Sequence, residues 1–175
     1  MKPTRCLLAS ALVLALAAAP AYAAEGGAKT APPHAGFDLL KSLSGTWERK
    51  HEDGKVTKLT YAIVSDGTAL METMDAPGMH AAMVTMYHAD GADLLMTHYC
   101  GSGNQPRMRC AKPAKDAKSL SFGFVDAANL ATPDAGHMHD LVITFVDADH
   151  ITQEWTWKQG DKEGKELFKF ERKRA

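Results

Sequence analysis

Apolar and polar residues alternate with a period of two through most of the chain after residue 45. Leu59, Tyr61 and Ile63 would share one face of a strand, and Phe168 and Phe170 would share one face of another. Successive side chains of a strand point to opposite faces, so each such segment can bury one face and expose the other. The pattern therefore predicts an all-β protein built from half-buried strands.

Ten strands are predicted, and the gaps between them are short and rich in turn-forming residues such as Asp-Gly. The expected strands span 46–51, 56–65, 68–75, 81–88, 93–100, 107–112, 118–125, 138–147, 150–158 and 165–173. Sequential strands joined by hairpins form an up-and-down antiparallel sheet, and so long a twisted sheet tends to close on itself. We therefore expect a single up-and-down antiparallel barrel, with a two-sheet sandwich as the alternative.

One short helix is expected before the strands. Phe37, Leu40 and Leu43 recur at helical spacing, and Gly45 follows directly after them. This spacing predicts one or two helical turns ahead of the first strand.

The first 23 residues have the pattern of a cleavable export signal. Lys2 and Arg5 precede an apolar run over 7–19, and residues 21–23 read Ala-Tyr-Ala, a small-x-small cleavage motif. The run is shorter than the roughly 20 residues that a membrane-spanning helix needs. We therefore expect a periplasmic or secreted protein without stable membrane insertion after cleavage.

The expected organisation is a cleaved signal peptide at 1–23, a flexible leader at 24–35 and a β-barrel domain at 36–175. The chain contains 20 Lys and Arg against 21 Asp and Glu, and the two signs are interspersed. A nucleic-acid interface needs a basic patch, so no nucleic-acid partner is expected. The expected partner is a small molecule, and the oligomeric state is left open.

Cys100 and Cys110 are the cysteines that remain after cleavage. In an oxidising compartment an even pair of cysteines is a disulfide candidate. A bridge would pin the loop between them at a rim of the barrel. Asn104 and Arg107 in that loop would then be placed to contact an acidic group of a ligand.

Histidines give a second possible chemistry. His137 and His139 would lie on the same side of an extended strand, and His98 is the candidate for a third ligand. Three imidazoles can hold a divalent metal. A metal-binding or haem-binding protein is therefore an alternative function.

Gly45-Thr46-Trp47, opening the first strand after a short helix, resembles the Gly-x-Trp start of the calycin superfamily of lipocalins, fatty-acid-binding proteins and nitrobindins. In that superfamily the tryptophan closes the floor of the barrel, and in lipocalins a basic residue of the last strand packs over it. The resemblance implies that Arg172 or Arg174 takes that place here.

The chain departs from fatty-acid-binding proteins, which insert two helices between their first two strands, because only residues 52–55 separate those strands here. Ten strands without inserted helices are more similar to the nitrobindin arrangement, a haem-binding barrel, but its haem-ligating histidine matches no particular position of this chain. The segments 97–100 (Thr-His-Tyr-Cys) and 104–107 (Asn-Gln-Pro-Arg) resemble exported bacterial proteins of unassigned function.

The leading hypothesis is a non-enzymatic carrier or sensor that binds a mostly apolar molecule inside the barrel. Its candidate binding residues combine aromatic, methionine and polar side chains: Tyr61, Tyr87, Met96, His98, Asn104, Arg107, Phe168 and Phe170. A small isomerase- or hydrolase-like enzyme using His98 with Glu72 or Glu154 is a further alternative. The sequence carries no hydrolase, phosphate-loop or dinucleotide motif, so no catalytic residue is assigned and no cofactor is named.

Overall fold

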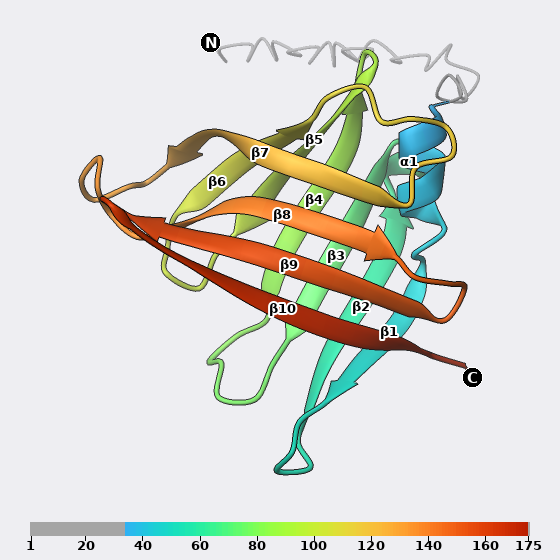
Figure 1. Cartoon of the computed structure of the whole chain (residues 1–175), viewed down its shortest axis with the longest axis horizontal. Helices are drawn as coiled ribbons and strands as arrows, with labels where there is room; N and C mark the ends of the chain where they lie inside the picture. The colour runs from blue at the N-terminus through green and yellow to red at the C-terminus, as the bar shows by residue number, and fades with distance from the viewer. Residues whose placement is uncertain (1–33, 175) are drawn as a thin grey trace, which may run out of the picture.

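Ten antiparallel strands follow one another around a closed barrel (Figure 1). The computed structural model of the chain describes residues 34–174. The strands are β1 (Gly45–Lys50), β2 (Val56–Val64), β3 (Ala69–Asp75), β4 (Met83–Asp90), β5 (Asp93–Tyr99), β6 (Gln105–Cys110), β7 (Ser119–Ala128), β8 (His137–Phe145), β9 (His150–Gln159) and β10 (Lys162–Lys173). Each strand pairs with its neighbours in sequence, and β1 pairs with β10. The predicted barrel is confirmed, and the sandwich alternative is wrong.

The period-two pattern corresponds to the two faces of the barrel wall. In β5, Leu94, Met96 and His98 are buried, whereas the residues between them are partly exposed. In β2, Leu59 and Tyr61 are buried in the same way. The buried faces of β2 and β5 therefore point into the lumen, where apolar burial supplies the main driving force for folding.

The helix α1 (Ala35–Lys41) lies against one end of the barrel (Figure 1). Phe37, Leu40 and the following Leu43 are buried in the same core as the strands. A Cβ atom on Gly36 would come within 2.2 Å of the Pro113 ring and 3.2 Å of Leu94, so the helix sits directly on the loop after β6 and the start of β5. This end is called the closed end, and the opposite end, where β9 turns into β10, is called the mouth.

Trp47 and Arg172 connect the helix, the first strand and the last strand. The Trp47 indole donates to the Leu43 carbonyl at 2.8 Å, and the Arg172 guanidinium lies 4.1 Å from the centre of the Trp47 ring. Arg172 also donates to the carbonyls of Ser44 and Ser42, both at 2.9 Å. The packing of a basic residue over the tryptophan is thus confirmed for Arg172.

Gly45, at the start of β1, lies next to the Arg172 guanidinium. Its φ of +120° lies in the region that favours glycine, and a Cβ there would lie 3.4 Å from the Arg172 guanidinium. Arg174, the other candidate, instead pairs with Asp149 at the surface.

The predicted Cys100–Cys110 disulfide is wrong, and both thiols are free. Cys110 pairs across the β5–β6 ladder with Leu94, six residues before Cys100. At about 3.3 Å per residue the two cysteines are on the order of 20 Å apart, whereas a disulfide needs Cα atoms within about 7 Å. The hairpin turns between Tyr99 and Gln105, so the two cysteines lie at unequal distances from the turn.

The predicted signal peptide and residues 24–33 of the predicted leader lie outside the described residues. Within residues 34–174, no helix combines the length and the apolar character needed to cross a bilayer.

Candidate functional site

A hydrogen-bonded polar network occupies the centre of the lumen. Glu72 on β3 accepts from the Tyr87 hydroxyl at 2.9 Å and from the Gln153 amide at 2.8 Å. The same amide group lies 2.7 Å from the Tyr61 hydroxyl, and the Trp155 indole donates to the Gln153 side-chain oxygen at 3.0 Å. All five side chains are at most 4% exposed. Such a network fixes the side chains that share it, because a buried polar group without a partner is costly.

His98 lies beside this network. Its ring centre is 4.8 Å from that of Trp155, and its Nδ1 is 2.9 Å from the Thr85 hydroxyl. Its other ring nitrogen, Nε2, is buried without a hydrogen-bond partner. Burial lowers the pKa of His98 to about 4, so the imidazole is neutral at physiological pH.

Burial also acts on the carboxyl of the network. It raises the pKa of Glu72 above its ordinary value, and the hydrogen bonds from Tyr61, Tyr87 and Gln153 oppose that rise. Burial, reinforced by the nearby Glu72 charge, raises the pKa of both tyrosines. The centre of the lumen therefore favours neutral forms of its ionisable groups.

A cleft opens in the barrel wall where β1 and β10 separate. These strands share only three residue pairs, of which the last is Glu48 with Glu171. Beyond that point β1 stays paired with β2 as far as Lys50, and β10 stays paired with β9 down to Lys162. The two strands therefore diverge, and a cavity of about 670 Å³, called the seam cleft, lies between them.

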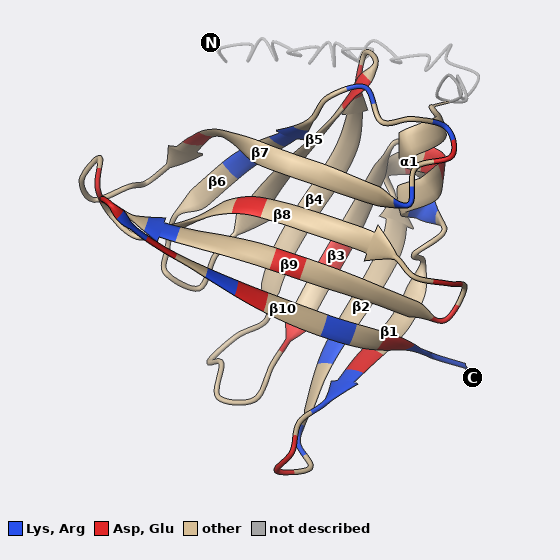
Figure 2. Ribbon diagram, viewed as in Figure 1, with Lys and Arg blue, Asp and Glu red and all other residues tan. Residues whose placement is uncertain are grey.

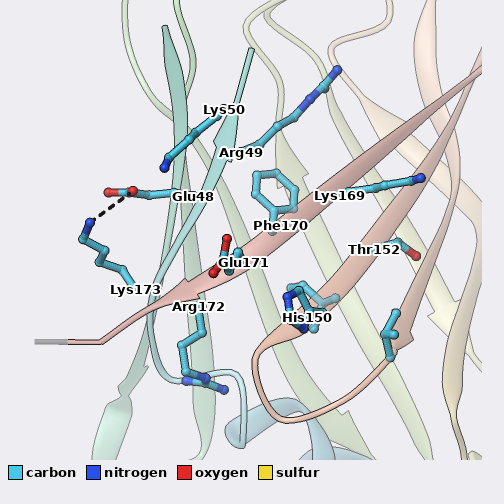
Figure 3. A pocket seen from close by; sticks show the side chains of 12 residues that line it. Glu48, Arg49, Lys50, His150, Thr152, Lys169, Phe170, Glu171, Arg172 and Lys173 are labelled. Atoms are coloured by element: carbon cyan, nitrogen blue, oxygen red, sulfur yellow. Dashed lines mark ion pairs between the residues drawn. The ribbon is translucent and has the colours of Figure 1, made fainter. Parts of the chain in front are cut away.

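The seam cleft combines an apolar floor with a cationic rim. Ile151 and Phe170 are buried residues that line it, and Figure 3 shows Phe170 between the side chains of β1 and those of β9 and β10. Figure 2 shows both basic and acidic residues along β1 and β10. The charged residues of the lining are Glu48, Arg49, Lys50, His150, Lys169, Glu171, Arg172 and Lys173.

Several of these cations already have partners. Lys173 lies 3.6 Å from Glu48, and Arg172 is held by Trp47 and backbone carbonyls. His150 contacts Asp147, which raises its pKa. Lys50 and Lys169, both exposed, form no ion pair within residues 34–174 and are therefore available to an anion.

A second, smaller cavity of about 220 Å³ lies at the mouth. It is called the mouth cavity and is lined by Met138, Trp155, Trp157, Gly164, Lys165, Glu166 and Phe168. Trp157 is 37% exposed, which is unusual for so large an apolar side chain on the inward parity of its strand. The aromatic residues of β9 and β10 thus form the walls of the mouth cavity, which is open to solvent.

Arg49 lies between the two cavities. It lines the seam cleft, while its guanidinium lies 4.7 Å from the centre of the Phe168 ring, a wall of the mouth cavity. The same group is 3.4 Å from a Glu166 carboxylate oxygen. Arg49 therefore covers the boundary between the seam cleft and the mouth cavity.

Most residues predicted to bind a ligand do lie on the inward face. Tyr61, Tyr87, Met96, His98 and Phe170 are almost completely buried. Phe168 has the same parity as Phe170, and the two rings are stacked with centres 6.2 Å apart. These six positions surround the polar network or the two cavities, so the sequence pattern identified the correct face of the wall.

Arg107 and Asn104 are placed differently from the expectation. Arg107 is exposed and forms a two-pronged ion pair with Asp126 on the neighbouring strand. Asn104 is buried and donates to the Gly136 carbonyl at 2.8 Å, joining the β5–β6 turn to the start of β8. The Arg107 charge is therefore neutralised outside the lumen rather than presented to a ligand.

The structure brings the rings of His137 and His139 together, without His98 in the same cluster. Their rings are 5.7 Å apart, and both lie 4.8 Å from the Phe124 ring. His98 contacts Trp155 and Thr85 instead. In the described part of the chain, no group of three His, Cys, Asp or Glu side chains is arranged to hold a metal ion.

The residues considered for an enzymatic site belong to different environments. His98 and Glu72 are both buried, but each hydrogen-bonds to other residues rather than to its counterpart. Glu154 lies on the outer face of the barrel, 3.4 Å from Lys165.

Sequence reasoning missed Gln153, Arg49 and Glu166. Gln153 lies two residues from both Ile151 and Trp155, so it belongs to the same inward face of its strand. Arg49 lies two residues after Trp47 and belongs to the inward face of β1. A polar residue on the apolar face of a strand is informative because it must find a partner when buried. A polar residue at a buried position would have identified Gln153 and Glu72. The position of Glu166 could not be found in this way, because it depends on where β10 diverges from β1.

Comparison of the chain with models of known protein families gave no match, and comparison with the curated proteins gave none either. The fold itself is a closed, ten-stranded, all-antiparallel up-and-down barrel, which is compatible with calycin-type folds and could hold a ligand.

Proposed function

We propose that the protein is an exported, calycin-type barrel that binds a small, mostly apolar molecule carrying an acidic group. The observation that carries this proposal is the seam cleft, where β1 and β10 diverge after Glu48 and Glu171. Its volume of about 670 Å³ is within the usual range of small-molecule sites. The calycin assignment is supported by the packing of Arg172 on Trp47.

The lining of the cleft argues for an amphipathic ligand. An apolar chain or ring placed against Phe170 and Ile151 would be removed from water, which is favourable in proportion to the area buried. A carboxylate, sulfate or phosphate at the rim would be attracted by Lys50 and Lys169. The polar network behind this floor keeps the inward side chains in place, so the ligand meets a preformed surface.

A matched pair of ligands tests the proposal. Decanoate and 1-decanol have the same alkyl chain and differ only in the head group, and their affinities are measured by calorimetric titration below their solubility limits. We expect decanoate to bind about fivefold to tenfold more tightly, because each partly exposed charge contact contributes up to about 1 kcal/mol. Equal affinities, or no heat for either ligand, would contradict the proposal.

Two variants locate the site. Replacing both rim lysines, in Lys50→Gln/Lys169→Gln, should remove most of the preference for decanoate over the alcohol. Lys115→Gln removes the same charge in the loop between β6 and β7, from an exposed residue that does not line the seam cleft, and should leave both affinities unchanged. If the control and the double variant behave alike, the ligand binds elsewhere.

The export part of the proposal has its own test. The intact mass of the protein recovered from the periplasm or the medium should correspond to a chain that begins at Ala24. A chain that retains residues 1–23 would contradict cleavage.

A further inference from the structure

We propose that the mouth cavity binds a small methylated ammonium cation, and that Arg49 competes with that cation for the same aromatic and carboxylate groups. This site is separate from the seam cleft, and its ligand has the opposite charge. Three features support this site: its aromatic walls, the position of Glu166, and the contacts that Arg49 already makes with Phe168 and Glu166.

The walls of the mouth cavity are aromatic. Trp155 and Trp157 from β9 and Phe168 from β10 line it, together with Met138. The face of an aromatic ring carries partial negative charge and attracts a cation, with tryptophan the strongest of the aromatic side chains. Three such residues around one cavity favour a cation over a neutral molecule of equal size.

The charges at the cavity favour the same ligand. Glu166 is its acidic residue, and the neighbouring Lys165 lies 3.4 Å from Glu154, a residue of the outer face. Because successive residues of β10 point to opposite faces, the Glu166 carboxylate belongs to the inward side and the Lys165 ammonium to the outward side. Lys165 also lines the cavity, but its ammonium lies beside Glu154, so Glu166 is the lining carboxylate that can meet a cation there.

Arg49 demonstrates that these groups accept a cation. Its guanidinium lies 4.7 Å from the centre of the Phe168 ring and 3.4 Å from a Glu166 carboxylate oxygen. The Glu166 side chain remains 64% exposed and the ion pair is long, so the contact is weak and open to competition. A bound cation would displace Arg49 from the Phe168 ring and from the Glu166 carboxylate. The Arg49 side chain would then turn toward the seam cleft, which it also lines.

The size and the polarity of the cavity select the kind of cation. A volume of about 220 Å³ at roughly 30 Å³ for each non-hydrogen atom holds on the order of seven such atoms. A primary ammonium is strongly hydrated and needs several hydrogen-bond acceptors, whereas the walls offer mainly rings and a thioether. A trimethylammonium group spreads its charge over methyl groups, so it loses less hydration free energy when it leaves water.

Choline and its uncharged carbon analogue, 3,3-dimethyl-1-butanol, test the inference because they have the same shape. Binding is followed by tryptophan fluorescence, since two of the three tryptophans of the chain line this cavity, and by calorimetric titration. We expect choline to bind at least about fivefold more tightly than the alcohol. Equal binding of the two molecules, or no binding of choline at millimolar concentration, would overturn the inference.

Matched variants of β10 identify the carboxylate and the ring. Glu166→Gln should weaken choline binding about fivefold, whereas Glu163→Gln, which removes an equal charge from the outer face of the same strand, should not change it. Phe168→Leu keeps an apolar side chain but removes the ring, so it should weaken choline and leave the alcohol unaffected. Equal effects of the two glutamate variants would show that the charge acts only at long range and would refute a site at Glu166.

Arg49→Met separates competition from a structural role. Removal of the internal cation should strengthen choline binding about threefold or more, and the same variant should weaken decanoate at the seam cleft. A variant that merely disturbed the barrel would weaken both ligands, and that result would refute the competition. Because choline and decanoate are measured separately, the failure of one site leaves the test of the other intact.

Discussion

The Gln153 amide donates to a Glu72 carboxylate oxygen at 2.8 Å and so joins β9 to β3 across the lumen. These strands are not neighbours in the barrel, because β10, β1 and β2 lie between them. The contact therefore connects two walls through the interior, and both of its side chains are at most 1% exposed.

Loss of this cross-lumen contact should be strongly destabilising. Gln153→Leu leaves Glu72, Tyr61 and the Trp155 indole without a shared partner, and we expect the free energy of unfolding to fall by about 2–4 kcal/mol. Chemical denaturation at pH 7 measures the change. Gln159→Leu, at the exposed end of the same strand, is the control and should cost less than about 0.5 kcal/mol. A similar small change in both variants would mean that the network adds little to stability.

Arg172 should not be replaceable by lysine. In Arg172→Lys the ammonium cannot both cover Trp47 and reach the carbonyls of Ser42 and Ser44, so we expect a loss of about 1–3 kcal/mol. Thermal or urea unfolding is the measurement. The matched change Arg174→Lys affects an exposed ion pair and should have an effect below about 0.5 kcal/mol. If both variants unfold alike, the planar guanidinium is not required.

The stability of the barrel should fall as the pH drops from about 6.5 to about 4 through the titration of His98. Its pKa in the folded state is lowered to about 4, whereas the unfolded value is about 6.5. Between these values the unfolded chain binds a proton that the folded chain does not, so the unfolded state gains stability as the pH falls, by up to about 3 kcal/mol. Urea unfolding at pH 7 and at pH 4.5 measures the loss.

A variant isolates this effect from that of Glu72, which acts with the opposite sign. Its pKa is raised on folding, so its protonation favours the folded state as the pH falls. His98→Gln keeps Glu72 in place and should show a smaller loss between the two pH values than the unchanged protein. An equal loss in both would exclude His98 as the titrating group.

The two thiols should react with a thiol reagent independently of each other. Cys100 is partly exposed, and Cys110 is buried, which raises its pKa. In the cleaved protein, purified without reductant, a thiol reagent should label Cys100 in the folded state and both cysteines in denaturant. Cys100→Ser should change the free energy of unfolding by less than about 1 kcal/mol, far below the 2–5 kcal/mol that loss of a native disulfide costs. A mass deficit of two hydrogens in the oxidised protein would contradict the free thiols.

The sequence predicted the number and the order of the strands, and it placed the strand boundaries to within a few residues. The expected strand at 56–65 is observed at Val56–Val64, and the one at 150–158 is observed at His150–Gln159. Hairpin turns and a period of two are local properties, so the residues themselves determine them. The inward positions of Tyr61 and Phe170 followed from the same period.

The local pattern did not determine which residues oppose one another. The register of the β5–β6 hairpin separates Cys100 from Cys110, and pairing across β6 and β7 joins Arg107 to Asp126. Register depends on where each turn reverses the chain, and a shift of a few residues changes every cross-strand contact. The spacing of residues in the sequence could therefore not predict that Cys100 and Cys110 stay apart or that Arg107 pairs with Asp126.

By itself, the sequence determined an all-β chain of hairpin-linked strands and the inward side of strands such as β2 and β10. The resemblance of its Gly-x-Trp segment implied a basic residue near the C-terminus over Trp47. Only the closed barrel brings Gln153 to Glu72. The same closure places Arg49 against Phe168 and Glu166. It also decided that β1 and β10 diverge after Glu48. These contacts join strands far apart in sequence, and their geometry depends on the twist and closure of the whole sheet, which no local run of residues encodes.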